Sequence, residues 1–541
     1  MAKTAHVDTF AIDNLPPRSQ WPEMFFELPE LRYPERLNCA VELLDRRVAA
    51  GEGDRPVIHA LVQGKPVTAT YAQLLAQANR IARVLTEDLA LVPGNRVLLR
   101  APNNPMMAAC WLAVIKAGLI AVATMPLLRA KELKQIIDKA RVGAALCDVR
   151  LADEMDAARA QCPDLAQVLY FNDGRPGSLD ALAAAKPVTF DDVDTALEDP
   201  CLIAFTSGTT GQPKGTVHFH RDVMAMCDCF PKSTLQAQPD EIFCGTPPLA
   251  FTFGLGGMLC FPMRVGASTV LSERLTPETL LATVEQFRAT TMFTAPTFFR
   301  QMSAIAKNHD LSSLRKCVSA GEALPDATRQ LWKNATGIEI IDGLGATEMI
   351  HIFVSHTPER ARRGATGYAI PGYRAAVLDD EGTPCLPGVV GRLAVKGPTG
   401  CRYLADERQT TYVKWGWNLT GDAYRMDEDG YFYYQARTDD MIISAGYNIA
   451  GPEVESALLA HEAVAECGVI GVADEERGQI VKAFVVLKPG YTGNTAMAKT
   501  LQDYVKNAIA PYKYPRAIEF RDALPRTETG KLQRFRLREG A

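Results

Sequence analysis

Apolar residues recur along the first third of the chain with two different periods. Between Tyr71 and Leu85 they fall three and four positions apart, which predicts an amphipathic helix over 71–88. Short apolar runs typical of buried strands follow, at 96–100, 119–124 and 144–149. Helical segments are expected between these strands, at 105–118 and 131–141. This alternation predicts a parallel sheet with helices on both faces.

The pattern changes further along the chain. The β/α alternation continues through 280–345, with strands at 291–295 and 339–342. From residue 365 short strands broken by Gly and Pro predict a β-rich subdomain, with strands at 374–378, 391–396 and 430–434. A compact block then combines helices at 452–461 and 496–509 with strands at 463–472 and 481–487. We therefore expect an N-terminal domain over 1–438, built of parallel α/β sheets plus the β-rich subdomain, and a small mobile α+β domain over 439–541.

One segment without any charged residue, 242–263, has the apolar character of a membrane helix. It contains three prolines and four glycines, which would break a lone spanning helix in lipid. We interpret it as the wall of a buried pocket. The N-terminus lacks the apolar core of a signal peptide, and the last residues are not a peroxisomal address, so we expect a cytoplasmic protein without a membrane partner.

Composition narrows the function classes. A chain of 541 residues, 47% apolar and 22% charged, is ordinary globular material for two or more domains. The net charge of −5, with scattered Lys and Arg, argues against a nucleic-acid partner. Thirteen cysteines without a repeated framework suit a reducing compartment. The eight histidines form no H-E-x-x-H or Cys/His sequence cluster, so we expect no structural zinc. A monomer and a homodimer remain equally open.

The most informative segment is Thr206-Ser-Gly-Thr-Thr-Gly-Gln-Pro-Lys-Gly215, which directly follows the apolar run 201–205. Its three glycines allow close approach of a ligand, and its backbone N–H groups and four hydroxyl residues can form a concave site for phosphate oxygens. Lys214 adds a positive charge. The common phosphate loop G-x-x-x-x-G-K-[ST] does not fit. The alternative is a mobile surface loop, although such loops seldom begin directly at a buried strand.

This segment resembles the phosphate-binding signature of the adenylate-forming superfamily, which includes acyl-CoA synthetases, peptide-synthetase adenylation domains and luciferases. Four further motifs resemble those of the superfamily, in its order: Gly343-Leu-Gly-Ala-Thr-Glu348, Thr420-Gly-Asp422, a stretch from Tyr434 to Asn448, and Pro525-Arg-Thr-Glu-Thr-Gly-Lys531. The resemblance implies ATP, Mg²⁺ and coenzyme A as cosubstrates and cofactors. It also implies the ATP- or AMP-binding residues Thr206, Ser207, Gly208, Thr209, Thr210, Lys214, Gly321, Glu322, Asp342, Gly343, Thr347, Asp422 and Arg437.

Glu348 is the candidate metal ligand. It follows the predicted strand 339–342, and a carboxylate at the carboxyl end of a strand facing the phosphate loop can hold the Mg²⁺ that ATP brings. Thr347 could contact the α-phosphate, so we group both with the catalytic residues. Asp422 could accept hydrogen bonds from the ribose hydroxyls. A solvated Glu that opens a helix is the alternative for Glu348. For Asp422 an ordinary Gly-Asp turn would by itself be the better explanation, and the resemblance reverses that order.

Three further roles come from the resemblance. Lys531 would be the catalytic lysine that stabilises the charges converging on the α-phosphate, although composition alone favours a solvated lysine in a basic tail. Asp439 would be the hinge about which the small domain rotates, with a helix-capping Asp as the alternative. After rotation, the loop Ser444, Ala445, Gly446 and Tyr447 would line a tunnel for the pantetheine arm of coenzyme A.

The acyl pocket decides which acid is activated. The resemblance places six residues around the carboxylate substrate: Phe251, Phe253, Gly254, Leu344, Gly345 and His351. Leu344 stands where many members have Tyr or Trp against adenine, and benzoate-type CoA ligases share such an aliphatic residue. The chain most resembles 2-aminobenzoate–CoA ligases, but Phe253 replaces a Tyr of benzoate-activating members. If 348–351 is helical, His351 shares a face with Glu348 and could accept a hydrogen bond from an ortho-amino group or donate one to a hydroxyl, depending on tautomer. A packed core histidine is the alternative.

The resulting hypothesis is ATP-dependent ligation of a small aromatic carboxylate, of the 2-aminobenzoate or benzoate type, to coenzyme A through an acyl-adenylate. A medium-chain fatty acyl-CoA ligase is the first alternative, because it would share every catalytic motif and differ only in pocket shape. A peptide-synthetase adenylation domain would need an acidic pocket residue for the amino group. A non-catalytic nucleotide-binding protein would be expected to lose Lys531, Glu348 or the phosphate loop, and all three are present.

Overall fold

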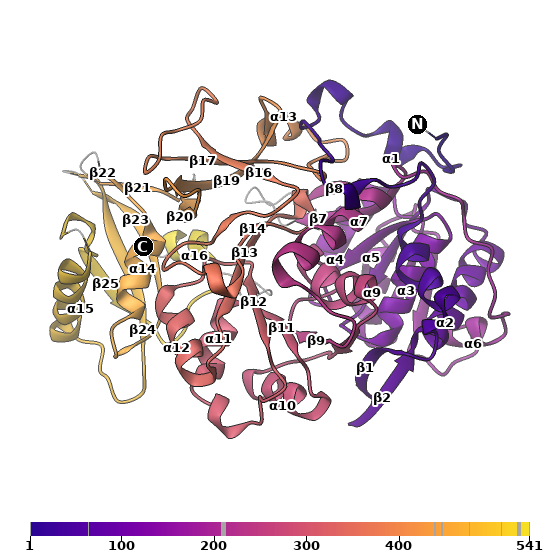
Figure 1. The fold of residues 1–541 in the computed structure, drawn as a ribbon, viewed down its shortest axis with the longest axis horizontal. Helices are drawn as coiled ribbons and strands as arrows, with labels where there is room; N and C mark the ends of the chain where they lie inside the picture. The colour runs from indigo at the N-terminus through magenta and orange to yellow at the C-terminus, as the bar shows by residue number, and fades with distance from the viewer. Residues whose placement is uncertain are drawn as a thin grey trace.

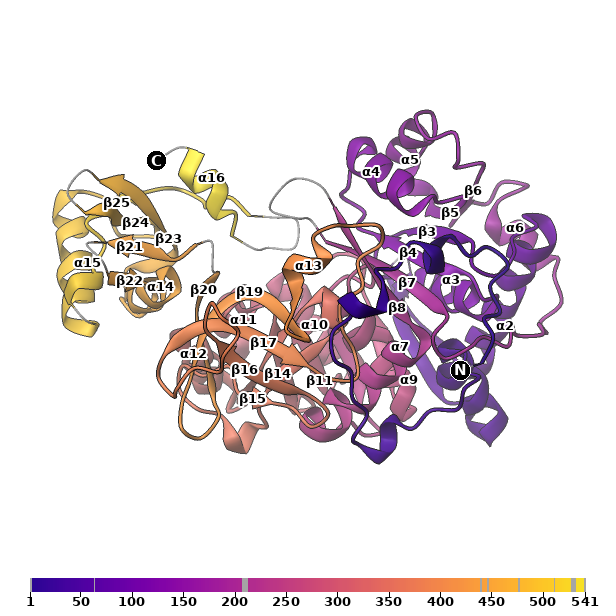
Figure 2. The same ribbon diagram turned by 90° about the horizontal axis from the view of Figure 1, so that it is seen from above.

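A computed structural model describes residues 2–62, 64–206, 213–437, 440–444, 447–474, 477–509, 511–526 and 532–539. In Figure 1 the elements run from the indigo N-terminal part on the right to the yellow C-terminal part on the left. Seen from above in Figure 2, the yellow elements form a separate small unit at one end of the molecule. The structure is therefore a mixed α/β protein with a large N-terminal part and a small C-terminal one.

A six-stranded sheet forms one half of the large part, in the order β6-β5-β3-β4-β7-β8. All neighbours are parallel except the antiparallel pair β7–β8. Its strands are β3 (Arg96–Arg100), β4 (Ile120–Thr124), β5 (Ala144–Asp148), β6 (Gln167–Phe171), β7 (Pro200–Thr206) and β8 (Lys214–Phe219). Successive residues of β3 serve different cores, because Val97 and Leu99 pack on one face and Leu98 on the other. The predicted two-faced α/β arrangement is confirmed.

A nine-stranded sheet forms the other half, in the order β15-β14-β13-β12-β11-β9-β10-β1-β2. The strands from β13 to β1 are parallel, and antiparallel strands extend both edges. They are β1 (Pro56–Val62), β2 (Lys65–Thr70), β9 (Ile242–Gly245), β10 (Ser268–Leu271), β11 (Thr291–Thr294), β12 (Lys316–Ala320), β13 (Ile340–Gly345), β14 (Ile352–Ser355) and β15 (Tyr368–Ala369). One continuous core packs against both sheets and joins them into one body.

Helices cover both sheets, and the first three of those below, α2 to α4, lie at positions that the sequence predicts. The main ones are α2 (Tyr71–Arg83), α3 (Pro105–Lys116), α4 (Ala130–Ala140), α5 (Ala152–Arg159), α7 (His220–Asp228), α10 (Pro277–Phe287), α11 (Pro296–Ser303) and α12 (Asp326–Thr336). The N-terminus of α2 has a capping box between Thr70 and Gln73, a device worth about 1 kcal/mol. The uncharged segment 242–263 forms β9, α8 (Thr252–Leu255), a π-helical turn and α9 (Phe261–Val265) inside the large part.

The β-rich segment forms a third, five-stranded sheet. Its order is β16-β17-β19-β18, and β20 pairs with β19. The strands are β16 (Arg374–Leu378), β17 (Val390–Lys396), β18 (Val413–Lys414), β19 (Trp417–Met426) and β20 (Phe432–Arg437), with the short helix α13 (Gln409–Tyr412) before β18. All of its pairs are antiparallel, which agrees with short strands separated by Gly- and Pro-rich turns.

The small C-terminal part has its own sheet and core. The sheet runs β22-β21-β24-β23, and β25 pairs with β24. Its elements are β21 (Ile442–Ser444), β22 (Tyr447–Ile449), α14 (Gly451–Leu459), β23 (Val464–Asp474), β24 (Gly478–Leu487), α15 (Thr495–Ala508), β25 (Ala517–Phe520) and α16 (Arg534–Glu539). Side chains from α14, α15 and this sheet share one hydrophobic cluster, as expected for an α+β unit.

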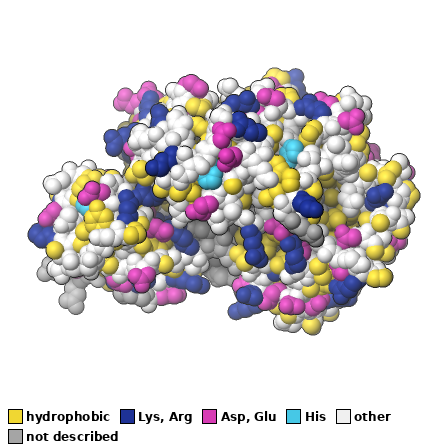
Figure 3. Space-filling view, turned by 90° about the horizontal axis from the view of Figure 1, so that it is seen from below, with side chains coloured by type: hydrophobic (Ala, Val, Ile, Leu, Met, Phe, Trp, Pro, Cys, Tyr) yellow, Lys and Arg dark blue, Asp and Glu magenta, His cyan; other side chains and the backbone are white. Residues whose placement is uncertain are grey.

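Two further features of the structure concern its surface charge and the length of its helices. On the face drawn in Figure 3, basic and acidic side chains are interspersed. Within the described part of the chain, no helix combines the length and the apolar character needed to cross a bilayer.

Candidate functional site

The predicted phosphate loop joins two paired strands. Thr206 ends β7 and pairs with Lys214, the first residue of β8, so the segment between them connects an antiparallel hairpin at the edge of the six-stranded sheet. The predicted ligands Ser207, Gly208, Thr209 and Thr210 lie outside the described residues. The Lys214 side chain is half-buried, and its Nζ lies 3.5 Å from the Tyr403 hydroxyl. The hairpin therefore brings Lys214 into contact with a residue that no sequence motif singled out.

The predicted metal ligand lies on a single turn after β13. Thr347 to Met349 form a 3₁₀ turn, and Ile350 then adopts a φ of 65°. The segment 348–351 is therefore not a continuous helix, so the condition for His351 to share a helix face with Glu348 is not met: a left-handed φ is unfavourable for a β-branched residue and ends the turn before His351. The buried Glu348 carboxylate accepts a hydrogen bond of 2.5 Å from the Tyr403 hydroxyl.

Buried side chains form hydrogen bonds to the backbone of this turn. His218 Nε2 lies 2.8 Å from the carbonyl oxygen of Thr347; since a carbonyl only accepts, Nε2 carries the proton. The Thr399 hydroxyl donates to the Met349 carbonyl at 2.9 Å. The Asp222 carboxylate, 3.7 Å from His218 Nδ1, also pairs with a buried arginine. Sequence reasoning missed these supports because they come from β8, α7 and the 397–403 segment, far from the motif in the chain.

The predicted ribose pair is assembled across two neighbouring strands. Asp422 in β19 faces Arg437 in β20, and Arg437 Nη1 donates to Asp422 Oδ1 at 3.1 Å and to the Thr420 carbonyl at 3.1 Å. Gly421 has a φ of 78°, and a Cβ there would lie 2.7 Å from the Arg437 guanidinium. The left-handed φ therefore favours a glycine between Thr420 and Asp422, where the arginine approaches closely.

The predicted adenine segment lies at the ends of β12 and β13. Asp342 is buried, and its Oδ1 accepts the N–H of Gly343 at 3.1 Å. Burial raises the pKa of Asp342 to about 8, so its carboxyl group is largely protonated at neutral pH. Gly321 follows β12 with a φ of 92°, and the next residue, Glu322, accepts a hydrogen bond from the Thr297 hydroxyl at 3.3 Å. These residues lie on and directly after two neighbouring parallel strands.

The predicted acyl pocket contains a histidine among aromatic rings. The His351 ring lies 4.4 Å from Phe261, 5.7 Å from Phe253 and 6.0 Å from Phe230, measured between ring centroids. Gly254 in α8 cannot carry a side chain, because a Cβ would lie 2.0 Å from the Pro248 carbonyl oxygen.

The other predicted pocket residues surround this group. Phe251 caps α8, Leu344 and Gly345 end β13, and β13 pairs with β14 directly after His351. The predicted pocket residues therefore gather between α8 and the turn that follows β13.

The tautomer of His351 follows from its contacts. Nε2 lies 3.3 Å from the Phe253 carbonyl oxygen and must donate its proton to it. Complete burial lowers the pKa of His351 to about 3, so the ring is neutral and Nδ1 is an acceptor. This buried Nδ1 has no hydrogen-bond partner within the described residues. An unsatisfied acceptor in an aromatic environment is suited to a ligand that carries a hydrogen-bond donor.

The small C-terminal part contacts the large part close to the nucleotide motifs. The half-buried Arg300 of α11 donates to the carbonyls of Leu459 at 3.2 Å, Val464 at 3.0 Å and Ala465 at 3.1 Å. Arg526 lies 3.7 Å from Glu322 of the adenine segment. These contacts fix the orientation of the two parts in this structure.

The remaining predicted residues belong to the C-terminal part or its junction. The predicted hinge Asp439, the catalytic lysine Lys531, and Ala445 and Gly446 of the tunnel loop lie outside the described residues. Ser444 is buried at the end of β21, where it pairs with Tyr447 of β22. The Tyr447 side chain is also outside the described part.

One group of side chains corrects the expectation that no Cys/His cluster exists. Cys39, Cys201 and His220 are buried with their potential ligand atoms within 4.8 Å of one another. They are far apart in sequence, so no spacing motif could indicate them. His220 Nδ1, 3.3 Å from the Cys39 sulfur, already accepts the backbone N–H of Cys39 at 3.1 Å. We therefore assign the cluster to core packing.

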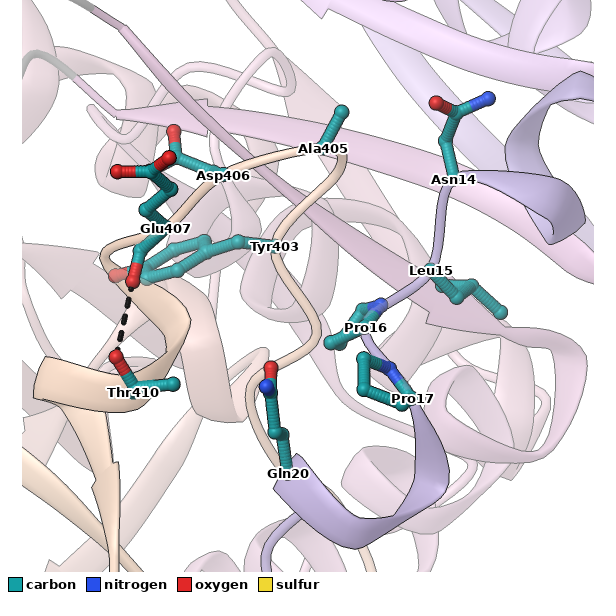
Figure 4. Close-up of a pocket in the computed structure, with 10 residues that line it drawn as sticks. All are labelled: Asn14, Leu15, Pro16, Pro17, Gln20, Tyr403, Ala405, Asp406, Glu407 and Thr410. Carbon is teal, nitrogen blue, oxygen red and sulfur yellow. Dashed lines mark hydrogen bonds between the residues drawn. The ribbon is translucent and has the colours of Figure 1, made fainter.

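A hollow of about 490 Å³ lies beside the site (Figure 4). It is bordered by the N-terminal segment 14–20, the loop 405–410 and the ring of Tyr403. Its lining contains none of the six predicted pocket residues. The hollow is therefore distinct from the predicted acyl pocket.

Comparisons with known proteins agree with this geometry. The AMP-binding enzyme family matches residues 45–403, and the AMP-binding enzyme C-terminal domain matches residues 453–531. Benzoate–CoA ligase of Thauera aromatica is 36% identical over 517 residues, which cover 94% of this chain and 97% of that protein. The mitochondrial acyl-coenzyme A synthetase ACSM5 of Homo sapiens is 33% identical over 526 residues, or 93% and 90% of the two chains.

A solved structure is similar over nearly the whole chain. The crystal structure of the anthranilate CoA ligase AuaEII in complex with anthranoyl-AMP has a TM-score of 0.90 and 33% sequence identity, covering 95% of this chain and 99% of that one. The family match, the relatives and the shared fold lead to one conclusion. The chain belongs to the AMP-binding enzyme family.

Proposed function

We propose that this protein is an AMP-forming acid–thiol ligase that joins an aromatic carboxylic acid of the 2-aminobenzoate type to coenzyme A. The observation that carries the proposal is the neutral His351, whose Nδ1 is a buried acceptor within a group of aromatic rings. Such a pocket favours a flat ring with a donor in the ortho position. The named activities of the benzoate and anthranilate ligase relatives support the same assignment.

The first half-reaction activates the acid. A carboxylate oxygen attacks the α-phosphorus of ATP, the bond to the bridging oxygen breaks, and pyrophosphate leaves with that electron pair. The product is an acyl-adenylate, in which AMP is a good leaving group. In this proposal Lys214 and the loop 206–210 bind phosphate oxygens, Asp422 and Arg437 hold the ribose, and Asp342 with Gly343 borders adenine.

Glu348 and Thr347 fit a magnesium site. Mg²⁺ binds in proteins through one or two carboxylates together with substrate phosphate oxygens, and the turn offers a carboxylate beside a hydroxyl. When bound, the ion supplies positive charge that offsets the charge developing on the phosphate oxygens. The contribution of the chain is orientation, since the Tyr403 hydroxyl and the His218 ring fix the two halves of this turn.

The second half-reaction transfers the acyl group. The sulfur of coenzyme A attacks the carbonyl carbon of the acyl-adenylate, the bond to the phosphate oxygen breaks, and AMP leaves. In this proposal Lys531 serves only the first step, the small domain (439–541) then rotates about Asp439, and the loop from Ser444 to Tyr447 lines the path of the thiol. The same proposal places the boundary between the two domains between residues 438 and 439.

A medium-chain fatty acid is the alternative substrate, since an acyl-coenzyme A synthetase is also among the relatives. Its chain has no donor for His351 Nδ1, and it would need an open tunnel where Phe253 and Phe261 pack against the histidine. The described geometry therefore supports the aromatic acid better.

Pyrophosphate release and thioester formation, measured with 2-aminobenzoate, benzoate and octanoate, test the proposal. We expect kcat/KM for both aryl acids to exceed that for octanoate by at least about tenfold, or roughly 1.4 kcal/mol of transition-state binding. Octanoate turnover equal to that of the aryl acids would support the alternative instead.

A further inference from the structure

Tyr403 lies between the two charged groups that the proposed function assigns to phosphate and metal. Its hydroxyl donates to Glu348 Oε1 at 2.5 Å, and Lys214 Nζ lies 3.5 Å from the hydroxyl oxygen of Tyr403. The Lys214 ammonium also lies 5.3 Å from the centre of the Tyr403 ring. The tyrosine is only 1% exposed and Glu348 is buried, whereas Lys214 is half-buried.

The position of the Tyr403 ring is fixed from several sides. Its backbone N–H donates to Gln409 Oε1 at 2.9 Å, and the residue forms a β-bridge with Thr216 of β8. The ring packs edge-on against Tyr412, with the centroids 5.8 Å apart. Gln409 is itself buried and bonded to the Gln20 and Cys401 carbonyls. A ring held in this way can orient the groups that its hydroxyl contacts.

The hydroxyl also separates two opposite charges. Within the part of the chain that the structure describes, no ion pair joins Lys214 directly to Glu348. A neutral phenol satisfies both, because its proton goes to the carboxylate and its lone pairs face the ammonium.

We propose that Tyr403 is a positioning residue, whose hydroxyl orients the Glu348 carboxylate for Mg²⁺ and keeps it from pairing with Lys214. The proposal rests on the proposed function. Through its hydroxyl, Tyr403 connects Lys214 in β8 of the six-stranded sheet to Glu348 in the turn that follows β13 of the nine-stranded sheet. Loss of the hydroxyl removes a charge-assisted hydrogen bond from Glu348 and opens a direct approach between carboxylate and ammonium.

The test compares Tyr403→Phe with Tyr412→Phe. Each variant loses one buried hydroxyl, but that of Tyr412 has no hydrogen-bond partner within the described residues. Binding of Mn²⁺, as a spectroscopic substitute for Mg²⁺, is measured by electron paramagnetic resonance in the presence of a non-hydrolysable ATP analogue. Loss of an outer partner of a metal ligand typically weakens metal binding about 10- to 100-fold. We expect a weakening of that order in Tyr403→Phe, with metal-free AMP binding within about twofold of wild type, and no change in Tyr412→Phe.

A double-mutant cycle separates positioning from general damage. In a Glu348→Gln background, Tyr403→Phe should have little further effect on Mn²⁺ affinity, because its partner carboxylate is already gone. Unchanged Mn²⁺ affinity in Tyr403→Phe would overturn the proposal, as would equal losses with and without Glu348 or a parallel loss of AMP binding. No acid takes part in these measurements, so an error in the proposed acid substrate leaves their outcome unaffected.

Discussion

His351 is expected to select an ortho donor on the substrate ring. Its Nε2 proton is committed to the Phe253 carbonyl, so Nδ1 can only accept. In 2-aminobenzoate one amino hydrogen can bond to the neighbouring carboxylate, which leaves the other free for Nδ1. A suitable comparison is 2-methylbenzoate, which has a similar shape but no donor. The ratio of kcat/KM for these two acids therefore isolates the hydrogen bond from the fit of the ring.

The magnitude follows from a neutral, buried hydrogen bond. Such a bond contributes about 0.5–1.5 kcal/mol net, so wild type should favour the amino compound over the methyl compound through this contact by about two- to twelvefold. His351→Leu keeps an apolar side chain at the site and removes the acceptor. The ratio should therefore fall by that factor, while kcat/KM for 2-methylbenzoate changes less.

The assay is initial-rate pyrophosphate release at several concentrations of each acid. Phe230→Leu is the matched control, because it alters the same aromatic surroundings, 6.0 Å from His351, without removing the acceptor. It should lower both substrates by similar factors and leave their ratio intact. Equal ratios in wild type and His351→Leu would refute the reasoning and leave His351 as a packed core residue.

The same ratio should not depend on pH near neutrality. The pKa of His351 is lowered to about 3, so Nδ1 remains an acceptor throughout the range from about pH 6 to 9. A histidine with an ordinary pKa near 6.5 would gain a proton on Nδ1 at the acid end of that range and could no longer accept. A preference for 2-aminobenzoate that collapses towards pH 6 would contradict the tautomer derived from the structure.

Three further outcomes are expected. Lys531→Ala should reduce pyrophosphate formation about 10²- to 10³-fold but spare thioester formation from a supplied acyl-adenylate, and a loss below tenfold would exclude the assigned role. Asp439→Pro should preserve adenylation and abolish thioester formation by fixing one backbone angle at the hinge; equal loss of both would indicate a structural residue. Asp342, with a folded pKa of about 8 against about 4 when unfolded, keeps a proton that the unfolded chain releases, so stability should fall as pH rises between these values. In thermal unfolding at pH 6 and 8, Asp342→Asn should show a smaller decrease in Tm than wild type, and equal decreases would contradict the shift.

The fold was predictable from the sequence where periodicity and burial coincide. The strands at 96–100 and 144–149 and the helix from residue 71 lie where apolar spacing placed them, because the two strands are buried on both faces and the helix buries one apolar face. The sequence does not reveal that the large part contains two sheets with a shared core. Strand order depends on contacts between distant segments, and local patterning carries no information about them.

The residues of the candidate site were likewise predictable only in part from the sequence. Motifs indicated the candidate residue types. The structure places Lys214 and Arg437 at strand ends, Glu348 on the turn after β13 and Asp422 within β19. The groups that orient them, such as Tyr403, lack a local signal because their partners lie more than fifty residues away. The turn at Ile350 was also missed, since its left-handed backbone opposes the intrinsic preference of the residue. Tertiary contacts override local preference there.

The contacts between the two parts of the molecule bear on how both half-reactions can use one site. Arg526 and Leu532 form a β-bridge on either side of the segment that includes Lys531, and Arg526 lies against Glu322 of the adenine segment. Rotation of the small domain would break the three hydrogen bonds of Arg300, and water would replace them at a net cost of about 0.5–1.5 kcal/mol each. A total of a few kcal/mol is within the range that differential binding of ATP, acyl-adenylate or coenzyme A can supply.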